Sequence, residues 1–348
     1  MVPVRFWYVK DSTRSIVVNS SFRTVSGQAM TDATDAENDS LDDIVERPSL
    51  LSDFAGQEAL RENLSVYINS ARRMAIPLDH VLLHGPPGLG KTTIARIIAN
   101  ELGVGFRVVA APAVGKPADL VSTLVALEER DVLFIDEIHR LPAPVEEVLY
   151  PVMEDFRLDL IVGDVGQAKA VSVPLPRFTL VGATTRLGSL TGPLRDRFGI
   201  DFRLEYYDDA EMTRVLARAA DRLRLSIEGE AVSEIARRSR GTPRVGLRLI
   251  RRVRDFAVSS NIEKVTWALA DEILTRIGVD RNGLNEWDRR YLDCIKTRFR
   301  GGPVGLSTLA AALGDSPDMI EHALEPYLIR KGLLDRTPRG RITVQAGD

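Results

Sequence analysis

Along residues 51–204, apolar positions follow two alternating patterns. Short β-branched or aliphatic runs predict strands, and they are separated by segments in which apolar residues recur every three or four positions, which predict helices. The strand-like runs are HVLLH, FRVVA, DVLFIDE and FTLVGATT, and the helical segments include KTTIARIIANEL and PAPVEEVLYPVMEDF. Strands that alternate with helices predict an α/β fold, a parallel sheet covered on both faces, because right-handed crossovers place the helices outside the sheet.

The pattern changes twice after this region. Residues 208–276 are helical throughout, without a strand-like run, and from residue 280 helices return around Gly-rich turns. The chain then finishes in LLDRTPRGRITV, which predicts a short strand, a tight turn and a second short strand. We expect four parts: a flexible N-terminal arm over 1–46, an α/β domain over 47–206, a helical domain over 207–278 and a terminal domain over 279–348.

A hairpin is predicted inside the α/β region. The segment RLDLIVGDVGQAKAVSVPLPRF alternates apolar and polar positions on both sides of GDVGQ. This period of two predicts a β-hairpin inserted at about residues 157–177. An alternating apolar face on a projecting hairpin needs a cover. A partner protein and the domain's own sheet are equally good candidates for that cover.

Composition places the chain among ordinary globular proteins. It has 348 residues, of which 44% are hydrophobic and 27% charged, enough for two or three domains with buried cores. No run approaches 18 consecutive apolar residues, so no membrane span is expected. The single cysteine, Cys294, excludes disulfides within the chain and cysteine-based metal sites, and the four histidines show no ligand spacing. We expect a cytoplasmic protein that does not bind membranes.

Charge is segregated along the chain, although the net charge is only −3. Residues 32–46 hold seven acids and no base, which is typical of a solvated arm, whereas residues 237–254 are rich in arginine and contain no acid. Because phosphate binding depends on local clusters, the net charge argues neither for nor against nucleic acid. Residues 1–29 lack the apolar core of a secretory signal, and we favour a start near Met30 over an address peptide.

The segment GPPGLGKT fits the pattern G-x-x-x-x-G-K-[ST], with a predicted strand before it and a predicted helix after it. Gly85, Gly88 and Gly90 have no Cβ, so the loop can turn its N–H groups toward phosphate oxygens at the positive end of the helix. Lys91 supplies a charge to the β and γ phosphates, and Thr92 offers a hydroxyl to Mg²⁺. A chance glycine-rich turn is the weaker interpretation, because strand, loop and helix occur together.

The strand-like run DVLFIDE ends in two acids. We expect Asp136 to bind Mg²⁺ and Glu137 to orient and deprotonate the attacking water, as phosphoryl transfer to water requires. Solvated acids at a strand end are the alternative, which is weaker for a pair beside a phosphate loop. The strand FTLVGATT ends in Thr184 and Thr185, where a hydroxyl can bind the attacking water, although threonine is common at strand ends.

Three arginines complete the candidate chemistry. Arg195 and Arg197 follow a Pro-initiated turn, and we expect one to pair with an acid while the other projects toward a nucleotide on an adjacent subunit, which implies head-to-tail assembly. A surface salt-bridge network explains the two equally well. Arg244 lies in the first turn of a predicted helix, where the dipole disfavours a cation unless an anion such as phosphate compensates.

These motifs, in this order, resemble the bacterial RuvB family of AAA+ motors, which drive branch migration of Holliday junctions. The resemblance runs from about residue 47 to residue 344 and rests on RPSLLSDFAGQ, LDHVLLHGPPGLGKTT, DVLFIDEIHRL, VEEVLYPVMEDF, LPRFTLVGATTR, GPLRDRFG, RRSRGTPR, GGPVG, LAAALG and RTPRGR. It implies an AAA+ P-loop NTPase domain, a helical lid domain and a C-terminal winged-helix domain, with ATP and Mg²⁺ as cofactors.

The resemblance also assigns roles to particular residues. It implies that Arg197, rather than Arg195, is the finger that acts on a neighbour's ATP. Arg336 and Arg341 are expected to contact the DNA backbone, although a solvated basic hairpin also fits RTPRGR. The residues expected to line the nucleotide site are Arg47, Gly88, Gly90, Lys91, Thr92, Thr93, Glu154, Asp155, Phe156, Arg197, Tyr207 and Arg244.

The family's partners become expectations for this chain. They are duplex and four-way junction DNA, a homohexameric ring, a RuvA-type junction-binding protein that docks on the hairpin, and a RuvC-type resolvase. The sequence departs from the family at the hairpin tip, which lacks Gly-Pro, at Leu247, where Asn is usual, and at VVAAPAVGKP, which replaces a more polar segment. These departures concern partner docking and the lid, and we expect ATP hydrolysis to be retained.

Two other functions compete with a DNA motor. A clamp-loader-like or protein-remodelling AAA+ ATPase would share the ATPase core but needs no basic terminal hairpin. A nucleotide-gated DNA-binding module without turnover would need neither Glu137 nor Arg197.

Overall fold

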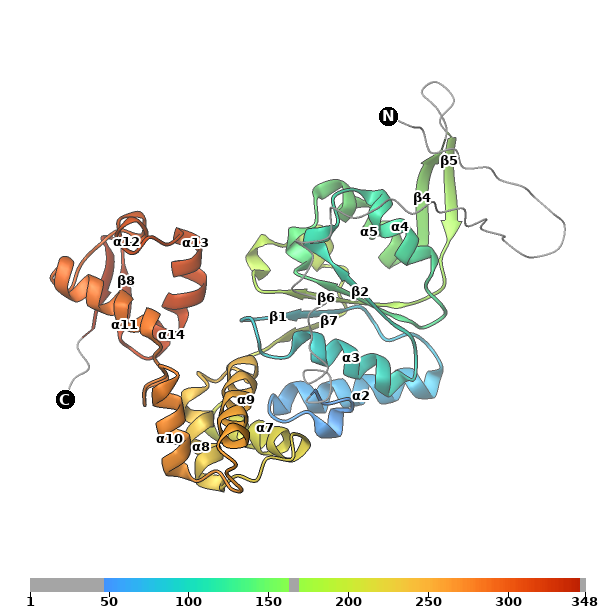
Figure 1. Cartoon of the computed structure of the whole chain (residues 1–348). Coiled ribbons are helices and arrows are strands. Elements are labelled where there is room, and N and C mark those ends of the chain that lie inside the picture. Colours follow the sequence, from blue (N-terminus) through green and yellow to red (C-terminus); the bar gives the residue numbers. More distant parts are fainter. Residues whose placement is uncertain (1–46, 163–168, 345–348) are drawn as a thin grey trace, which may run out of the picture. The chain divides into compact units, whose positions relative to one another are not determined.

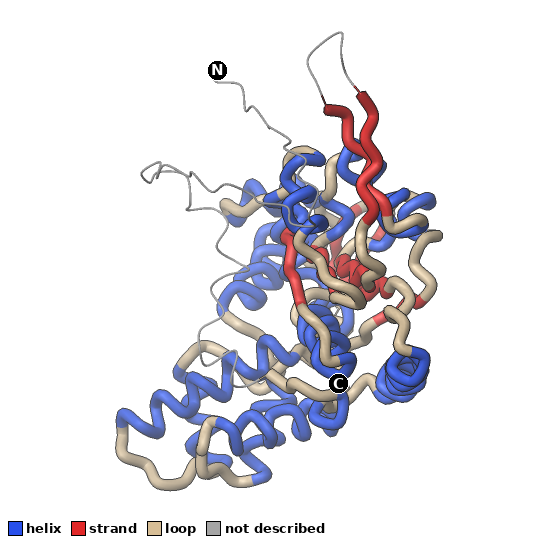
Figure 2. Tube along the Cα trace, turned by 90° about the vertical axis from the view of Figure 1, so that its right-hand side faces the viewer, coloured by secondary structure: helices blue, strands red, loops and turns tan. Residues whose placement is uncertain are grey.

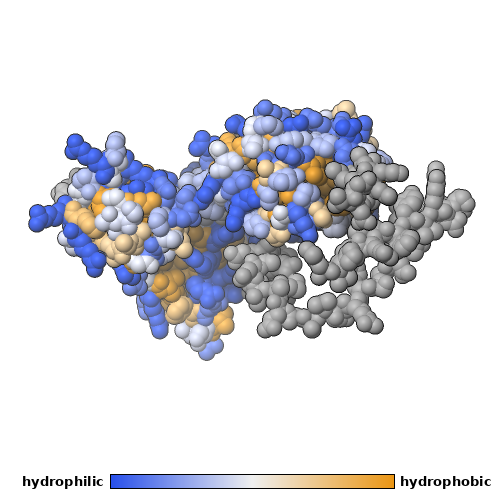
Figure 3. Space-filling model, turned by 90° about the horizontal axis from the view of Figure 1, so that it is seen from above, coloured by the Kyte–Doolittle hydropathy of each residue, from blue (hydrophilic) through white to orange (hydrophobic). Residues whose placement is uncertain are grey.

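The computed structural model describes residues 47–162 and 169–344. The expected N-terminal arm and the tip of the expected hairpin lie outside these residues. None of the helices in the described ranges combines the length and apolar character that a membrane crossing needs. Among the residues coloured in Figure 3, hydrophilic ones predominate, and apolar residues form smaller patches between them.

Five parallel strands form the central sheet, in the order β2-β3-β6-β1-β7. Their bounds are β1 Val81–His84, β2 Phe106–Ala110, β3 Val132–Asp136, β6 Thr179–Thr184 and β7 Ile200–Arg203. The predicted parallel α/β fold is confirmed. The prediction omits β7, because its four residues alternate buried and exposed at the edge of the sheet and lack the continuous apolar run of a central strand.

Helices cover both faces of this sheet (Figure 1). On one side are α2 Glu58–Met74 and α3 Lys91–Leu102, and on the other are α4 Pro117–Val125 and α5 Ala143–Glu154. Alternate residues of β1 serve the two faces, since Val81 and Leu83 belong to one core and Leu82 to the other. Short connecting helices cover Leu51–Asp53, Ala111–Ala113, Ile138–Arg140, Leu187–Ser189 and Gly192–Arg195.

An antiparallel hairpin of β4 Arg157–Val162 and β5 Lys169–Pro174 extends from this domain (Figures 1 and 2). Leu158 pairs with Val173, and both pack into the core beside α4 and α5. Val171, which lies on β5 two residues further from the base of the hairpin than Val173, is 44% exposed. The domain itself therefore covers the base of the apolar face, and the face becomes exposed further along the hairpin.

Four helices follow the sheet domain: α7 Asp209–Arg222, α8 Gly229–Arg238, α9 Pro243–Ser259 and α10 Trp267–Arg276. Their apolar residues continue the core that α2 and α3 share with the sheet. A Cβ at Gly246 of α9 would lie 2.7 Å from Met212 Cε on α7, so this glycine allows the two helices to pack closely. Leu247 packs partly buried against the same core, which accommodates an apolar side chain where the family has Asn.

The terminal domain has its own core, made by helices and a small hairpin. A bridge between Val304 and Arg341 adds a third short extended segment, and the predicted winged-helix architecture is confirmed. The elements are α11 Glu286–Asp293, a π-helical turn Cys294–Arg298, α12 Leu306–Leu313, α13 Pro317–Met319, a second π-helical turn Ile320–Leu324, α14 Glu325–Arg330, β8 Leu334–Thr337 and β9 Gly340–Thr343.

Substitution of Phe134 tests whether its ring is part of the buried core between the sheet and its helices. Phe134 lies on β3 with no exposed surface, and its ring is 6.1 Å from that of Phe106. Phe134→Ala should lower the free energy of unfolding by about 3–5 kcal/mol, because it leaves a cavity between sheet and helices. Urea denaturation measures the change, with Val108→Ala, at a position 46% exposed on β2, as the control expected to change by less than about 0.5 kcal/mol. Equal losses in the two variants would contradict this core.

Candidate nucleotide-binding and hydrolysis site

The loop between β1 and α3 can be built only with glycine at its turning points. Gly85, Gly88 and Gly90 have φ values of +139°, +78° and +104°, which side chains disfavour. A Cβ at Gly85 would also lie 2.4 Å from the carbonyl oxygen of Leu204. The loop therefore curls tightly onto the first turn of α3, whose backbone N–H groups are not used within the helix and are available to an anion.

Lys91 lies inside this loop. Its side chain is buried, and its ammonium group donates to the carbonyl oxygens of Gly85 at 2.8 Å and Pro86 at 2.9 Å. An ammonium group has three donors, so one remains for a phosphate oxygen. Burial lowers the pKa of Lys91, and the charges of Glu137 and Asp136 oppose that shift. The loop, the lysine and the two acids therefore belong to one electrostatic environment.

The sheet explains why these groups meet. The strands β3, β6 and β1 are neighbours and run in the same direction, with His84 of β1 in register with Thr184 of β6. Parallel strands place all their carboxyl ends at the same end of the sheet. The phosphate loop, Glu137 and Thr185 follow such ends and Asp136 is the last residue of β3, so the topology of the sheet places all of them at the same end.

Glu137 is held in place by its neighbours. Its backbone is left-handed, with φ +48°, and its carboxylate accepts from Thr185 N at 3.2 Å and Thr185 Oγ1 at 3.0 Å. His139 Nδ1 lies 3.2 Å from the same carboxylate and 2.9 Å from Thr184 Oγ1. A carboxylate fixed at this edge can orient water and accept its proton. Sequence reasoning missed His139, although it follows directly in DEIH.

Asp136 has the properties of a magnesium ligand. Burial raises its pKa, and the neighbouring Glu137 carboxylate raises it further, so a nearby cation would stabilise its ionised form. Thr92 and Thr93 lie in the first turn of α3. Mg²⁺ usually takes one or two protein ligands together with phosphate and water, and an Asp136 carboxylate with a Thr92 hydroxyl fits that requirement. Within the described ranges there is no cluster of three or more His, Cys, Asp or Glu that could hold a metal.

The helical domain contributes to the same site. Arg244 N donates to the carbonyl oxygen of Gly88 at 3.3 Å, and a Cβ at Gly88 would lie 2.9 Å from Thr242 Cγ2. Tyr207 Oη donates to the carbonyl oxygen of Leu89 at 3.3 Å. Burial raises the pKa of Tyr207 well above its usual range, so this hydroxyl stays a donor. Backbone contacts thus join the helical domain directly to the phosphate loop.

Arg197 lies at the opposite end of the sheet, where the parallel strands have their amino ends. It precedes β7, whose first residue donates from Ile200 N to the carbonyl oxygen of His80, and His80 precedes β1. Each four-residue strand spans about 13 Å, so this edge is well separated from the phosphate loop of the same chain. Glu154 ends α5, and Asp155 and Phe156 follow it at this same end of the sheet, where His80 Nε2 lies 3.0 Å from the carbonyl oxygen of Met153.

The expectation that Arg197 projects freely differs from the structure. Its guanidinium lies 4.3 Å from the ring centre of Tyr150 and 3.1 Å from the Glu154 carboxylate, and its side chain is only 21% exposed. Tyr150 and Glu154 are four residues apart on α5, so they offer an aromatic face and a carboxylate on one side of the helix. Arg195 is the more exposed of the two, at 51%, and pairs weakly with Asp201. Sequence reasoning missed Tyr150, because nothing local in the sequence connects it to Arg197.

Arg336 and Arg341 are also engaged within the chain. The Glu325 carboxylate is fully buried, and it accepts from Arg336 Nε at 2.6 Å, Arg341 Nε at 2.9 Å and Tyr291 Oη at 2.8 Å. The two arginines thus neutralise a buried acid, and Arg336 keeps 40% of its side chain exposed. Arg339, in the turn between them, is exposed. Arg47 is partly buried at the start of the described residues.

Three family models match the chain in succession. They are the Holliday junction DNA helicase RuvB P-loop domain over residues 46–204, the RuvB AAA lid domain over 207–280 and the RuvB C-terminal winged helix domain over 281–347.

Comparisons with known sequences and solved structures point to the same family. The Holliday junction branch migration complex subunits RuvB of Paramagnetospirillum magneticum and Rhodospirillum centenum are each 55% identical over 301 residues, which is 86% of this chain and 87% and 83% of theirs. The solved Thermotoga maritima RuvB Holliday junction branch migration motor is 44% identical, with a TM-score of 0.78, and the match covers 86% of this chain and 96% of that one.

Lys91 and Glu137 should separate binding from hydrolysis. Lys91→Ala should abolish ATP binding, because the buried charge that faces phosphate is lost. Glu137→Gln should bind ATP normally and lower turnover by at least about 10²-fold, because an amide cannot accept the proton of water. Fluorescent-nucleotide titration and phosphate release measure the two steps. Normal turnover in Glu137→Gln would remove Glu137 from the chemistry.

Thr185 should act through Glu137. Thr185→Val removes the hydroxyl that holds the carboxylate but keeps the backbone N–H contact, so turnover should fall by about 10-fold while the Kd for ATP stays unchanged. Thr185→Ser, which keeps the hydroxyl, is the matched control and should retain most activity. An equal loss in the Ser and Val variants would show that shape, rather than the hydrogen bond, matters at this position.

Proposed function

The chain belongs to the RuvB family, and we propose from this that it is an ATP-driven motor that promotes branch migration of Holliday junctions in recombination and DNA repair. The observation that carries the proposal is the single edge of the sheet that gathers Lys91, Asp136, Glu137 and Thr185, closed by backbone contacts from the lid. A AAA+ ATPase site of this kind hydrolyses ATP. The terminal winged-helix domain makes DNA the substrate to be moved.

The residues of one chain would perform the hydrolytic half of the reaction. The phosphate loop and Lys91 bind the phosphates, and Tyr207 and Arg244 close the site from the lid side. Asp136 and Thr92 would hold Mg²⁺, which when bound neutralises phosphate charge. Glu137, oriented by Thr185 and His139, takes the proton of the attacking water.

A second copy of the chain would supply the other half. Arg197 and the segment Glu154–Phe156 lie at the edge opposite the phosphate loop, so they are able to face a nucleotide only on a neighbouring subunit. A contact between two different ends of the sheet is head-to-tail, and such contacts form a ring when the rotation from one subunit to the next closes. We propose a homohexameric ring in which Arg197 leaves Glu154 and moves toward the neighbour's γ phosphate.

The partners follow from the surfaces. Duplex and four-way junction DNA would bind the winged-helix domain through Arg339 and the exposed part of Arg336, by phosphate contacts that favour no sequence. The exposed part of the β4–β5 hairpin, including Val171, is the proposed docking surface for a RuvA-type protein, with a RuvC-type resolvase acting on the same junction. A cytoplasmic location goes with this function. A clamp-loader-like or protein-remodelling role is less well supported, because neither uses a winged-helix domain of this kind.

Arg197 and Arg195 make a matched pair for testing the motor. Arg197→Ala should assemble normally and lower ATP turnover by about 10³-fold, because transition-state charge on the neighbour's phosphate is no longer neutralised. Arg195→Ala, the more exposed neighbour, should keep near-normal turnover. The measurements are phosphate release and ATP-dependent dissociation of a synthetic four-way junction, with and without a RuvA-type protein. Hydrolysis by the unaltered chain without junction dissociation would contradict the motor, and full turnover in assembled Arg197→Ala would contradict the shared site.

A further inference from the structure

A six-residue segment of the lid contacts both the phosphate loop and the terminal domain. It covers residues 239–244, which are the connection after α8 and the first two residues of α9. At its end, Arg244 N donates to the carbonyl oxygen of Gly88 in the phosphate loop at 3.3 Å. Near its start, Arg240 Nε donates to the carbonyl oxygen of Gly283, just before α11 of the terminal domain, at 2.8 Å. The two contacts are four residues apart, so a movement of one displaces the other.

Arg240 is the principal link to the terminal domain. Its guanidinium pairs with the carboxylate of Asp288, which has no exposed surface, and lies 4.6 Å from the ring centre of Tyr327. Asp288 also accepts from Asn285 N at 2.8 Å, in the capping box at the start of α11. A buried carboxylate requires a cation, so Arg240 is fixed to the first turn of this helix. Arg240 itself lies after the end of α8 and has a left-handed backbone, with φ +59°.

A second contact joins the same two parts. Arg330 of α14 donates to the carbonyl oxygen of Arg240 and lies 3.6 Å from the ring centre of Tyr206. The next residue, Tyr207, contacts the phosphate loop through Leu89 and donates from its backbone N–H to Gly241 at 3.0 Å. The hydrogen bonds of both routes therefore meet at residues 240–241, and further contacts with the terminal domain are made by Tyr206 with Arg330 and by Arg186 with Asp318, at 3.0 Å.

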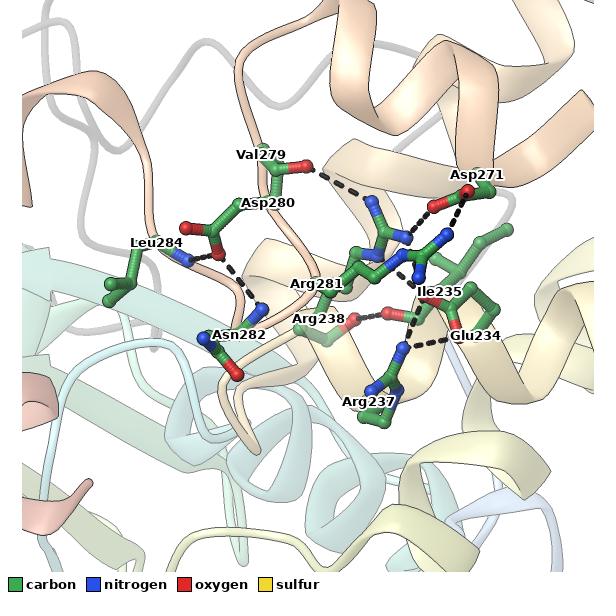
Figure 4. Close-up of polar contacts among 11 residues, drawn as sticks. Glu234, Ile235, Arg237, Arg238, Asp271, Val279, Asp280, Arg281, Asn282 and Leu284 are labelled. Carbon is green, nitrogen blue, oxygen red and sulfur yellow. Dashed lines mark hydrogen bonds and ion pairs between the residues drawn. The ribbon is translucent and has the colours of Figure 1, made fainter. Parts of the chain in front are cut away.

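The connection between the lid and the terminal domain, residues 277–285, is held by hydrogen bonds near both of its ends. Figure 4 shows the guanidinium of Arg238 beside Asp271 of α10 and the carbonyl oxygen of Val279, with Glu234 on its own helix. Arg238 has no exposed surface and holds the start of the connection at 3.1 Å from Val279, and Arg240 holds its end at Gly283. A connection fixed at both ends transmits displacement instead of absorbing it.

We propose that Arg240 is a positioning residue that couples nucleotide binding at the phosphate loop to the orientation of the winged-helix domain. ATP draws Arg244 and residues 241–243 toward its phosphates, and the Arg240–Asp288 pair carries that movement to α11. Arg240 contacts neither Lys91 nor Glu137, so it affects the movement and not the chemistry. This inference rests on the proposed motor function and names the residue through which the motor transmits its stroke.

The test compares full-length rings with and without this link. Arg240→Met combined with Asp288→Asn removes the pair without leaving a buried charge alone. Arg237→Met is the control, because Arg237 lies near the end of α8, three residues before Arg240, is 45% exposed and, among the described residues, forms its ion pair with Glu234. Hydrogen–deuterium exchange is measured with and without ATPγS over residues 85–93, in the phosphate loop, and 282–293, in α11. ATP turnover without DNA and junction dissociation are measured in parallel.

In the unaltered chain and in Arg237→Met, ATPγS should change exchange in both segments. In the double variant the change at 85–93 should persist and that at 282–293 should disappear. Turnover without DNA should stay within about twofold, and junction dissociation should slow by at least about tenfold, within the usual range of coupling effects. If the double variant does not fold, Arg240→Lys carries the test, since it keeps the charge but loses the contact with Gly283, and it should lose most of the change at 282–293.

Two outcomes overturn the inference: an exchange response at 282–293 that is unchanged in the altered ring, or no response there in the unaltered chain. Failure of the motor function is visible separately. If the unaltered chain responds to ATPγS in both segments but does not dissociate the junction, the coupling stands and the motor does not.

Discussion

The direction of the strands in the central sheet determines where each proposed catalytic group lies. Parallel strands bring their carboxyl ends to one edge, and the phosphate loop, Glu137 and Thr185 follow such ends in three adjacent strands. Arg197 precedes a strand and therefore lies at the other edge. The proposed hydrolytic residues are thus assembled within one chain, while the same geometry keeps Arg197 away from them. A division of one site between two edges is what a head-to-tail ring can reunite.

Buried charge is the second constraint, and arginine satisfies much of it. Arg238 is fully buried between Glu234 and Asp271, and Glu325 is fully buried against Arg336 and Arg341. Removing one partner of such a pair leaves an uncompensated charge, at a cost of about 3–5 kcal/mol. An arginine-rich run in this sequence therefore reflects internal pairing as well as attraction to phosphate, which explains why its density alone does not locate the DNA-contacting surface.

The sequence predicts features whose cause is local and fails where the cause is a distant contact. The phosphate loop could be predicted because its glycines have positive φ and stand at fixed spacing beside a strand and a helix. The strand ending at Asp136 could be predicted because four buried residues precede two acids. The partner of Arg197 could not, since Tyr150 is distant in the sequence and only packing brings its ring to the guanidinium. The engagement of Arg336 likewise depends on Glu325, which belongs to a different element.

The lid segment shows how both constraints can serve movement. Its contacts with the phosphate loop and with Tyr207 use backbone atoms, which cannot relax by changing rotamer. Gly241, with φ +62°, allows that approach, because a Cβ there would lie 2.5 Å from the carbonyl oxygen of Tyr207. Toward the terminal domain, the planar guanidinium of Arg240 has five donors and binds Asp288 and the carbonyl oxygen of Gly283 at the same time, which a lysine could not do. Rigid contacts on both sides of a short segment favour displacement of a whole domain over local adjustment. The proposed coupling therefore depends on the short distance along the chain between Arg244, which contacts the phosphate loop, and Arg240, which contacts a buried carboxylate.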